Sequence, residues 1–360
     1  MARGRVSRLS VRDVRFPTSL GGHGSDAMHT DPDYSAAYVV IETDAEDGLK
    51  GYGITFTLGK GTEVDWSRER RGASGDGGRS QCGVGPVGQA GGKEEHMLTG
   101  GYPAYTTSCA WLGYSDDTLK QAGPGLNRRT HVFHRFKVKV GADVQDDVRR
   151  CRLIRDMIGP EKTLMMDANQ RWDVPEAVEW MSKLAEFKPL WIEEPTSPDD
   201  ILGHAAISKA LVPLGIGVAT GEQCHNRVIF KQLLQANALQ FLQIDSCRLG
   251  SVNENLSVLL MAKKFGIPVC PHAGGVGLCE LVQHLIIFDY ISVSASLDNR
   301  MCEYVDHLHE HFKYPVRIQE ASYMPPMDAG YSTEMKEESV KKHQYPDGEV
   351  WKKLLAAQKN

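Results

Sequence analysis

Acidic and basic residues recur at a nearly constant interval through the second half of the sequence. Each follows a short apolar run, and successive ones stand 23 to 29 residues apart: Lys139, Asp167, Glu193, Glu222, Asp245, His272 and Asp298. This interval is the length of one strand–helix unit, and in a (β/α)8 barrel the carboxyl ends of all strands meet at one mouth, where active sites lie. The spacing therefore predicts a closed barrel with a site at its mouth, because an open sheet would spread these residues far apart.

Three of these residues, Asp167, Glu193 and Glu222, are carboxylates at the ends of consecutive predicted strands. Carboxylates that face one another repel strongly unless a cation lies among them. Oxygen ligands without Cys or His favour Mg²⁺ over zinc. Each carboxylate alone could cap a helix or pair with a basic side chain, but the three together predict a Mg²⁺ site.

Two further pairs of residues could move protons. Lys137 and Lys139 flank a valine, so strand alternation places both on the inner face of the barrel, where each ammonium group lowers the pKa of the other. Lys139 is therefore predicted to act as a base near neutral pH. Asp245 and His272 end neighbouring strands, and a carboxylate beside an imidazole orients the ring and raises its basicity.

A carboxylate substrate held on Mg²⁺ between two acid–base groups points to one class of reaction. A base removes the proton next to the carboxylate, and the metal stabilises the enediolate that forms. The second group then either returns a proton to carbon, which is racemisation, or expels a β-hydroxyl, which is dehydration.

Alternating strands and helices must carry these residues. From residue 102 onward, short aliphatic runs alternate with stretches that carry apolar residues at three- and four-residue spacing. The predicted strands are Ala104–Thr107, Phe136–Val140, Leu164–Asp167, Leu190–Glu193, Gly217–Thr220, Phe241–Ile244, Pro268–Cys270 and Ile291–Ala295. The predicted helices are Val144–Ile158, Pro175–Phe187, which Asp173 could cap, Asp200–Leu211, Arg227–Ala236, Val252–Phe265 and Gly277–Asp289.

The N-terminal part of the sequence has a different pattern. Residues 1–64 are predicted to form an antiparallel meander of three strands, Val6–Phe16, Ala36–Thr43 and Gly51–Thr57. The Gly-rich loop Ser19–Tyr34 between the first two is of the kind that covers a site. Residues 65–101 are rich in Gly and lack apolar periodicity, so we expect an irregular or disordered segment there.

The composition argues against several classes of protein. The chain has 360 residues and a formal net charge of −5, which gives no electrostatic basis for binding nucleic acid or an anionic membrane. Its longest apolar runs are shorter than the ~20 residues of a membrane-spanning helix. The eight cysteines are scattered without a C-x-x-C pair, which is typical of reduced thiols in an intracellular protein.

The local sequences at the strand ends form a combination of motifs. They are Phe136-Lys-Val-Lys-Val-Gly, Met166-Asp-Ala-Asn-Gln-Arg-Trp, Trp191-Ile-Glu-Glu-Pro, Thr220-Gly-Glu-Gln-Cys-His, Gln243-Ile-Asp-Ser-Cys-Arg and Cys270-Pro-His-Ala-Gly-Gly. Together they resemble the enolase superfamily in its mandelate-racemase-like branch, and within it the L-fuconate dehydratases. The resemblance covers residues 1–64 and 102–360.

The resemblance implies an α/β fold, a (β/α)8-type barrel with an N-terminal α+β capping domain. Residues 1–64 would form the N-terminal part of the cap, 102–302 the catalytic barrel, and 303–360 a segment that returns to the cap. Residues 65–101 do not resemble the helices that this family has in its cap, so we expect the cap to be truncated.

The resemblance also implies a role for each residue at the mouth. Asp167, Glu193 and Glu222 would hold Mg²⁺. Lys139 would be the base at C2, and Lys137 would help to bind the substrate carboxylate.

Further roles follow from the same resemblance. His272, oriented by Asp245, would protonate the departing 3-hydroxyl, and Asn169 would lie beside the metal and the substrate. His23, in the loop before the second strand, would reach the substrate from above. Asp298 stands where the family usually has Glu and would contact the substrate.

The implied activity is the dehydration of an acid sugar such as L-fuconate to a 2-keto-3-deoxy acid, a hydro-lyase reaction. Two alternatives stay open: a catalytically impaired variant without the full cap, and a racemase or epimerase of similar acids. The resemblance implies a mitochondrial location, with the cytoplasm as the alternative. The expected partner is a small acid sugar, and a homo-oligomer stays open.

Overall fold

The computed structural model describes residues 5–30, 32–58, 92–108, 110–120 and 132–357. It begins with a three-stranded antiparallel sheet in the order β1 (Val6–Phe16), β2 (Tyr34–Thr43) and β3 (Lys50–Leu58). These strands match the predicted ones to within two residues at each end. A 3-10 turn, η1 (Thr18–Gly21), opens the loop between β1 and β2.

A ring of parallel strands follows. In ring order it consists of β4 (Tyr102–Thr106), β5 (Arg135–Lys139), β6 (Thr163–Asp167), β7 (Trp191–Glu193), β8 (Gly217–Thr220), β9 (Phe241–Leu242), a bridge at Val269 and β10 (Cys302–Tyr304). The ring closes because β10 pairs with β4 and the backbone nitrogen of Glu303 donates to Pro271. The predicted (β/α)8-type barrel is therefore confirmed.

Helices on the outside of the barrel connect its strands. They are α3 (Asp116–Lys120), α5 (Val144–Ile158), α6 (Val174–Leu184), α7 (Ile201–Leu211), α8 (Arg227–Gln235), α9 (Val252–Phe265) and α10 (Leu278–Phe288), with 3-10 turns η2 (Ala185–Phe187) and η3 (Val212–Leu214) after α6 and α7. Side chains cap several of their N-termini, and Asp173 accepts a hydrogen bond from the backbone of Glu176, as predicted.

Large apolar side chains fill the interior of the barrel. One cluster contains a residue from or next to every strand of the ring except β5, whose inward side chains are lysines: Tyr105, Met165, Trp191, Ala219, Phe241, Cys270 and Met301. Because strand residues alternate between faces, the residues two positions further along these strands also point inward and reach the mouth. The apolar cluster is thus the floor beneath the polar residues of the site.

The last strand of the ring is not where the sequence predicts it. Ile291–Ala295 does not form a strand, because Asp289–Ser294 is a π-helical turn, η4, that continues α10. A short run with β-branched residues directly after a helix can either continue as a helical turn or form a strand. The periodicity of so short a run does not distinguish these two structures. The closing strand is β10, and Pro268–Cys270 contributes only the bridge between Val269 and Leu242.

The expectation of an irregular segment over 65–101 is partly wrong. Its end forms a helix, α2 (Lys93–Gly100), whose buried Met97 belongs to the main core. The rest of the segment falls on residues 59–91, which lie outside the described residues, as do residues 121–131.

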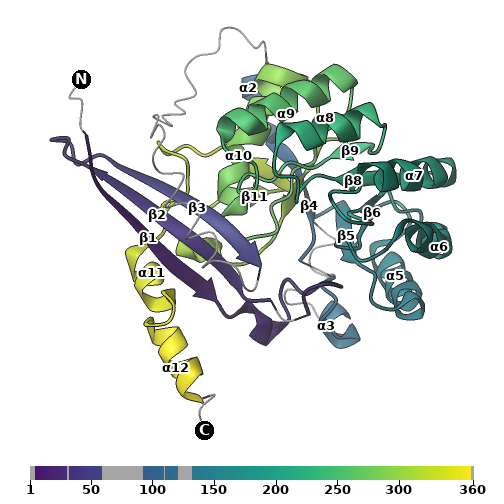
Figure 1. Cartoon of the computed structure of the whole chain (residues 1–360), viewed down its shortest axis with the longest axis horizontal. Coiled ribbons are helices and arrows are strands. Elements are labelled where there is room, and N and C mark those ends of the chain that lie inside the picture. The colour runs from purple at the N-terminus through teal and green to yellow at the C-terminus, as the bar shows by residue number, and fades with distance from the viewer. Residues whose placement is uncertain (1–4, 31, 59–91, 109, 121–131, 358–360) are drawn as a thin grey trace.

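The C-terminal residues return to the first sheet. A hairpin, β11 (Arg317–Gln319) and β12 (Ser322–Met324), pairs with β4 and follows a 3-10 turn, η5 (His309–His311). The helices α11 (Glu337–His343) and α12 (Glu349–Ala357) come last. In Figure 1 they lie beside the purple sheet, away from the barrel helices, and Trp351 Nε1 donates to the carbonyl of Arg15 at 2.9 Å.

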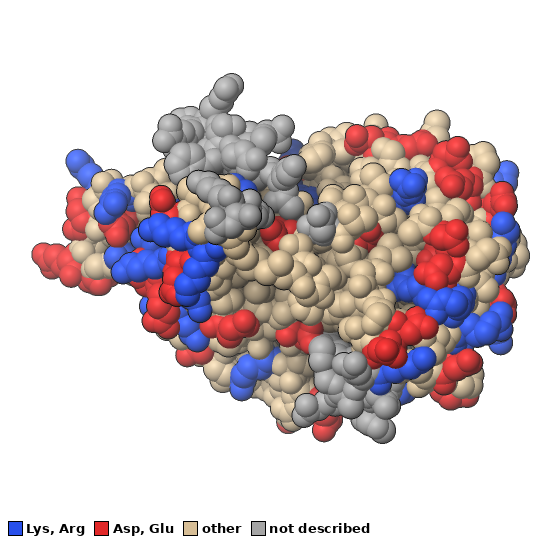
Figure 2. Space-filling model, turned by 90° about the horizontal axis from the view of Figure 1, so that it is seen from below, with Lys and Arg blue, Asp and Glu red and all other residues tan. Residues whose placement is uncertain are grey.

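The face shown in Figure 2 carries acidic and basic side chains in alternation around a broad zone with neither. No single sign of charge dominates this face. Among the described residues, no helix combines the length and the apolar character that a membrane crossing needs.

Candidate active site

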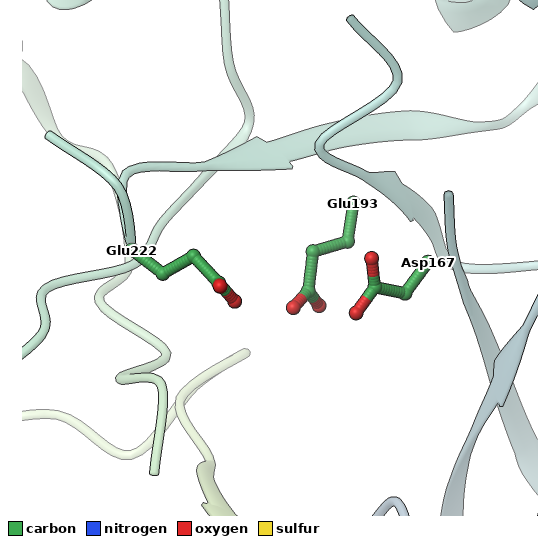
Figure 3. A group of neighbouring side chains, drawn as sticks. All are labelled: Asp167, Glu193 and Glu222. Carbon is green, nitrogen blue, oxygen red and sulfur yellow. The ribbon is translucent and has the colours of Figure 1, made fainter. Parts of the chain in front are cut away.

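Three carboxylates converge at the mouth of the barrel. Asp167 ends β6, Glu193 ends β7 in register with it, and Glu222 follows β8. One oxygen from each lies within 4.8 Å of the other two, and all three residues are buried (Figure 3). The structure therefore brings the three predicted ligands together.

A tight turn sets the position of Glu222. Gly221 precedes it with a φ of +134°, and a Cβ atom there would lie 2.3 Å from the carbonyl oxygen of Gln243. Only glycine allows this conformation and this close approach of two backbones. The Gly-Glu pair is thus a structural requirement for the third carboxylate.

The three carboxylates fit a divalent cation. Burial raises the pKa of Glu193, the charge of Lys137 opposes this, and the neighbouring Asp167 adds to it, so that the pKa reaches about 8. Burial is the largest cause of this shift, and a cation among the three carboxylates would stabilise their charged forms. Buried carboxylate oxygens at this separation are the donor set that Mg²⁺ prefers.

The two lysines of β5 lie beside these carboxylates. Lys137 Nζ is 2.5 Å from Glu193 Oε1, and Lys139 Nζ donates to Asp167 Oδ2 at 2.6 Å and to Asn169 Oδ1 at 2.9 Å. Both side chains point inward, and Asn169 is beside the triad, as predicted.

The pKa of Lys139 differs from the prediction. Burial and the charge of Lys137 both lower it, but the charge of Asp167 outweighs them, and the pKa lies above its usual value. The prediction of mutual lowering considered the two ammonium groups alone. It did not include the carboxylates, which lie closer to each lysine.

Across the mouth, His272 and Asp245 form the predicted pair. His272 Nδ1 is 2.6 Å from Asp245 Oδ2. Burial alone would lower the pKa of His272, but the charge of Glu222 and the bond to Asp245 raise it to about 9. In the ring, β4 and β10 separate this pair from Lys139 on one side, and β6 to β8 separate them on the other.

Two predicted substrate contacts are misplaced. Asp298 is exposed, in the turn between η4 and β10. Glu303 of β10 takes the inward position instead, where Oε1 is 3.0 Å from Lys137 Nζ and Oε2 accepts from the backbone of Ala273 at 3.0 Å. The wrong assignment of the last strand caused this error.

The other misplaced residue is His23. Its Nδ1 is 2.7 Å from Tyr114 Oη and its ring stacks on His307, outside the lining of the cavity at the mouth. His29, six residues later in the same loop, lines that cavity and contacts Asp26 at 3.2 Å.

The cavity above the triad has a volume of about 400 Å³. The barrel contributes Lys139, Asn169 and His272 to its wall, and β3 of the first sheet contributes Thr55 and Thr57. Most of its lining side chains can form hydrogen bonds, which suits a polar ligand better than an apolar one. Arg248, which the sequence analysis did not single out, also lines it.

The family model "Enolase C-terminal domain-like" matches residues 121–339. Human mitochondrial enolase superfamily member 1 is 68% identical over 445 aligned residues, which cover all of both chains. Because this chain has 360 residues, at least 85 positions of that alignment have no counterpart in it. L-galactonate dehydratase of Hypocrea jecorina is 42% identical, over 95% of this chain and 94% of its own.

Solved structures agree with these matches. The crystal structure of the human relative superposes with a TM-score of 0.89 at 66% identity, covering 98% of this chain and 99% of its own. A racemase from Streptomyces coelicolor, solved with bound magnesium, has a TM-score of 0.73 at 24% identity, covering 94% of this chain and 100% of its own. By sequence along its whole length and by fold, the chain belongs to the enolase superfamily.

Proposed function

We propose that the protein is a Mg²⁺-dependent dehydratase of an acid sugar, L-fuconate or a near relative, and that the product is a 2-keto-3-deoxy acid. The observation that carries the proposal is that Lys139 and His272 face one polar cavity next to the carboxylate triad. The relative named L-galactonate dehydratase supports the same class of substrate.

Asp167, Glu193 and Glu222 would hold the metal. Bound there, Mg²⁺ would supply positive charge to the substrate carboxylate and to the negative charge that develops on it. Lys137, which is completely buried between Glu193 and Glu303, adds a fixed positive charge beneath the same position.

The chain's own residues would then move two protons. Lys139 takes the proton from the carbon next to the carboxylate, for which it must first release the proton that the charge of Asp167 stabilises. His272, held by Asp245, gives a proton to the 3-hydroxyl, which leaves as water. The resulting enol takes up a proton at C3 as it becomes the 2-keto-3-deoxy acid, so the overall change is the loss of one water molecule.

The racemase alternative uses the same two groups but leaves the 3-hydroxyl in place. It predicts exchange of the C2 hydrogen with solvent deuterium and inversion at C2, without formation of a keto acid. The fate of the 3-hydroxyl therefore separates the two reactions.

We also propose that the residues missing relative to the human protein belong to the capping domain, so that residues 1–64, with the C-terminal segment 303–360 that returns to them, form the rest of the cap. The sheet β1–β3 still supplies Thr55 and Thr57 to the cavity wall. If the missing part is needed for turnover, the chain would be an impaired variant. The names of its relatives support a mitochondrial location.

The test is Mg²⁺-dependent formation of the 2-keto-3-deoxy acid from L-fuconate by the purified chain. We expect product that disappears with a chelator and returns with added Mg²⁺. Glu222→Gln should abolish turnover, whereas Glu186→Gln, a surface change, should not. Turnover by Glu222→Gln would contradict the metal assignment, and a folded wild-type chain without product would favour the impaired variant.

A further inference from the structure

Arg248 lies in the turn that follows Asp245 and lines the cavity. Its Nη1 atom donates to Asp245 Oδ2 at 3.0 Å, and its backbone nitrogen donates to Oδ1 at 2.8 Å. The side chain is only 19% exposed, and its guanidinium carbon lies 5.8 Å from the centre of the Phe56 ring. Burying an arginine in the wall of an active site costs desolvation free energy unless ion pairs and hydrogen bonds of the guanidinium offset it.

The hydrogen bonds to Asp245 divide between its two oxygens. Oδ1 accepts from the backbone nitrogens of Cys247 and Arg248, so the turn itself fixes this atom. Oδ2 accepts from His272 Nδ1 and from Arg248 Nη1. Among the described residues, Arg248 is thus the one side chain besides His272 that donates a hydrogen bond to Asp245 Oδ2, the atom that orients the imidazole.

The hydrogen bonds of Arg248 lie on the His272 side of the site. Within the described part of the chain, Lys139 donates to Asp167 and Asn169, on β6 and just after it, and no hydrogen bond joins it to Arg248 or Asp245. The charge of Arg248 also acts on Glu222, but its side-chain hydrogen bond goes to Asp245, the carboxylate that holds His272. A change at Arg248 therefore removes a bond from the partner of His272 and leaves the bonds of Lys139 in place.

From this arrangement we infer that Arg248 is a positioning residue for His272, and that it governs the loss of the hydroxyl group but not the removal of the C2 proton. Its guanidinium holds Asp245 Oδ2 in place by a hydrogen bond from the cavity side, so that the imidazole of His272 keeps its orientation toward the 3-hydroxyl that leaves. The inference rests on the proposed function for its kinetic consequence, while the hydrogen bond itself does not depend on the identity of the substrate.

The kinetic test compares two rates in the same sample. L-Fuconate is incubated in D₂O with Mg²⁺ and either the wild type or Arg248→Gln, and both deuterium at C2 of the recovered substrate and keto acid are measured. We expect the dehydration rate to fall about 10- to 100-fold, the usual cost of losing a partner that orients a functional side chain. The rate of C2 exchange should stay that of the wild type.

Two further variants control this experiment. Arg152→Gln removes an arginine of a surface ion pair with Glu186 and should change neither rate. Arg248→Lys keeps the charge but not the planar fork, so it should recover part of the dehydration rate. If Arg248→Gln lowers both rates in equal proportion, or neither, the inference is wrong. If Arg248→Gln does not fold, the same comparison is made with Arg248→Lys, for which a smaller but equally one-sided loss is expected.

A spectroscopic test separates this inference from the proposed function. The short bond between His272 and Asp245 should give a strongly downfield imidazole N–H resonance in protein labelled with ¹⁵N-histidine, assigned by its loss in His272→Gln. We expect Arg248→Gln to shift or broaden that resonance and Arg152→Gln to leave it unchanged. An unmoved resonance overturns the inference. A wild type that neither exchanges nor dehydrates L-fuconate overturns the proposed function instead, and the resonance still decides the role of Arg248.

Discussion

Trp191 donates a hydrogen bond from Nε1 to Oε2 of Glu193, 3.1 Å away and two residues further along the same strand. The indole belongs to the apolar floor of the barrel, and the carboxylate belongs to the triad above it. The floor therefore does more than fill space, because it fixes the direction in which a metal ligand points.

This bond predicts a specific effect of Trp191→Phe. The variant keeps an aromatic ring in the floor but loses the donor, so Mg²⁺ affinity should fall about 10- to 100-fold. Calorimetric titration with Mg²⁺ measures it. Trp172→Phe is the control, because the buried Nε1 of Trp172 has no hydrogen-bond partner among the described residues. Equal affinities for the two variants would show that the bond does not support the ligand.

The corrected position of the last strand predicts that one of two acidic residues is needed for turnover and the other is not. Glu303→Gln removes the negative charge next to Lys137 and should lower turnover at least about tenfold, since buried charge partners are strongly coupled. Asp298→Asn changes an exposed side chain and should leave turnover unchanged. Steady-state kinetics of the two purified variants decide between this structure and the sequence-based assignment, which expects the reverse order.

Gly221 should tolerate no side chain. Ala there would adopt a φ of +134° with its Cβ in the backbone of Gln243. The strained backbone alone costs about 1–3 kcal/mol of stability, and the clash adds to it. Gly159→Ala is the matched control, because it also has a positive φ but nothing within 4 Å. Denaturant unfolding should rank Gly221→Ala as the less stable, and a similar loss in both variants would mean that the turn can adjust.

A histidine far from the triad predicts a pH dependence of folding. His284 packs on Tyr331, with ring centres 4.4 Å apart, and burial lowers its pKa to about 4. Because the folded pKa lies below the unfolded value of about 6.5, the unfolded chain binds the extra proton first. Stability should therefore be full above pH 6.5 and fall toward pH 4, by at most about 1.4 kcal/mol per pH unit from this group.

His284→Phe keeps the stacked ring and removes the titration. Unfolding free energies at pH 7 and pH 5 should differ less in this variant than in the wild type. The comparison isolates His284 because other groups titrate equally in both proteins. The same difference in both would show that His284 is protonated at little cost in the folded state.

Much of the site can be predicted from the sequence because the spacing of the strand-end residues along the chain corresponds to their order around the ring. Strand–helix units have similar lengths, so Asp167, Glu193 and Glu222 recur at intervals that report their places in the ring. The interval fails at its end, where η4 and the turn after it separate His272 from Glu303 by more than one regular unit. The strand β10, Cys-Glu-Tyr, has no aliphatic run of the kind that marks β7, although both have three residues.

Other features depend on distances that a sequence does not contain. His23 and His29 stand in the same loop, and which of them enters the cavity is decided by the contacts of Tyr114 and Asp26. The charge state of Lys139 is likewise set by the 2.6 Å approach of Asp167. Such placements depend on how separate elements pack, and the order of residues within one element does not determine them.

The C-terminal helices have a consequence for how the protein is made. Tyr345 donates from its backbone to Asp13, Gln344 bridges to Val14, and Trp351 donates to Arg15, so β1 receives its outer partners from the far end of the chain. The sheet that supplies part of the cavity wall is therefore incomplete while residues 344–351 are still inside the ribosome. Synthesis therefore makes β1 among the first elements and its outer contacts among the last.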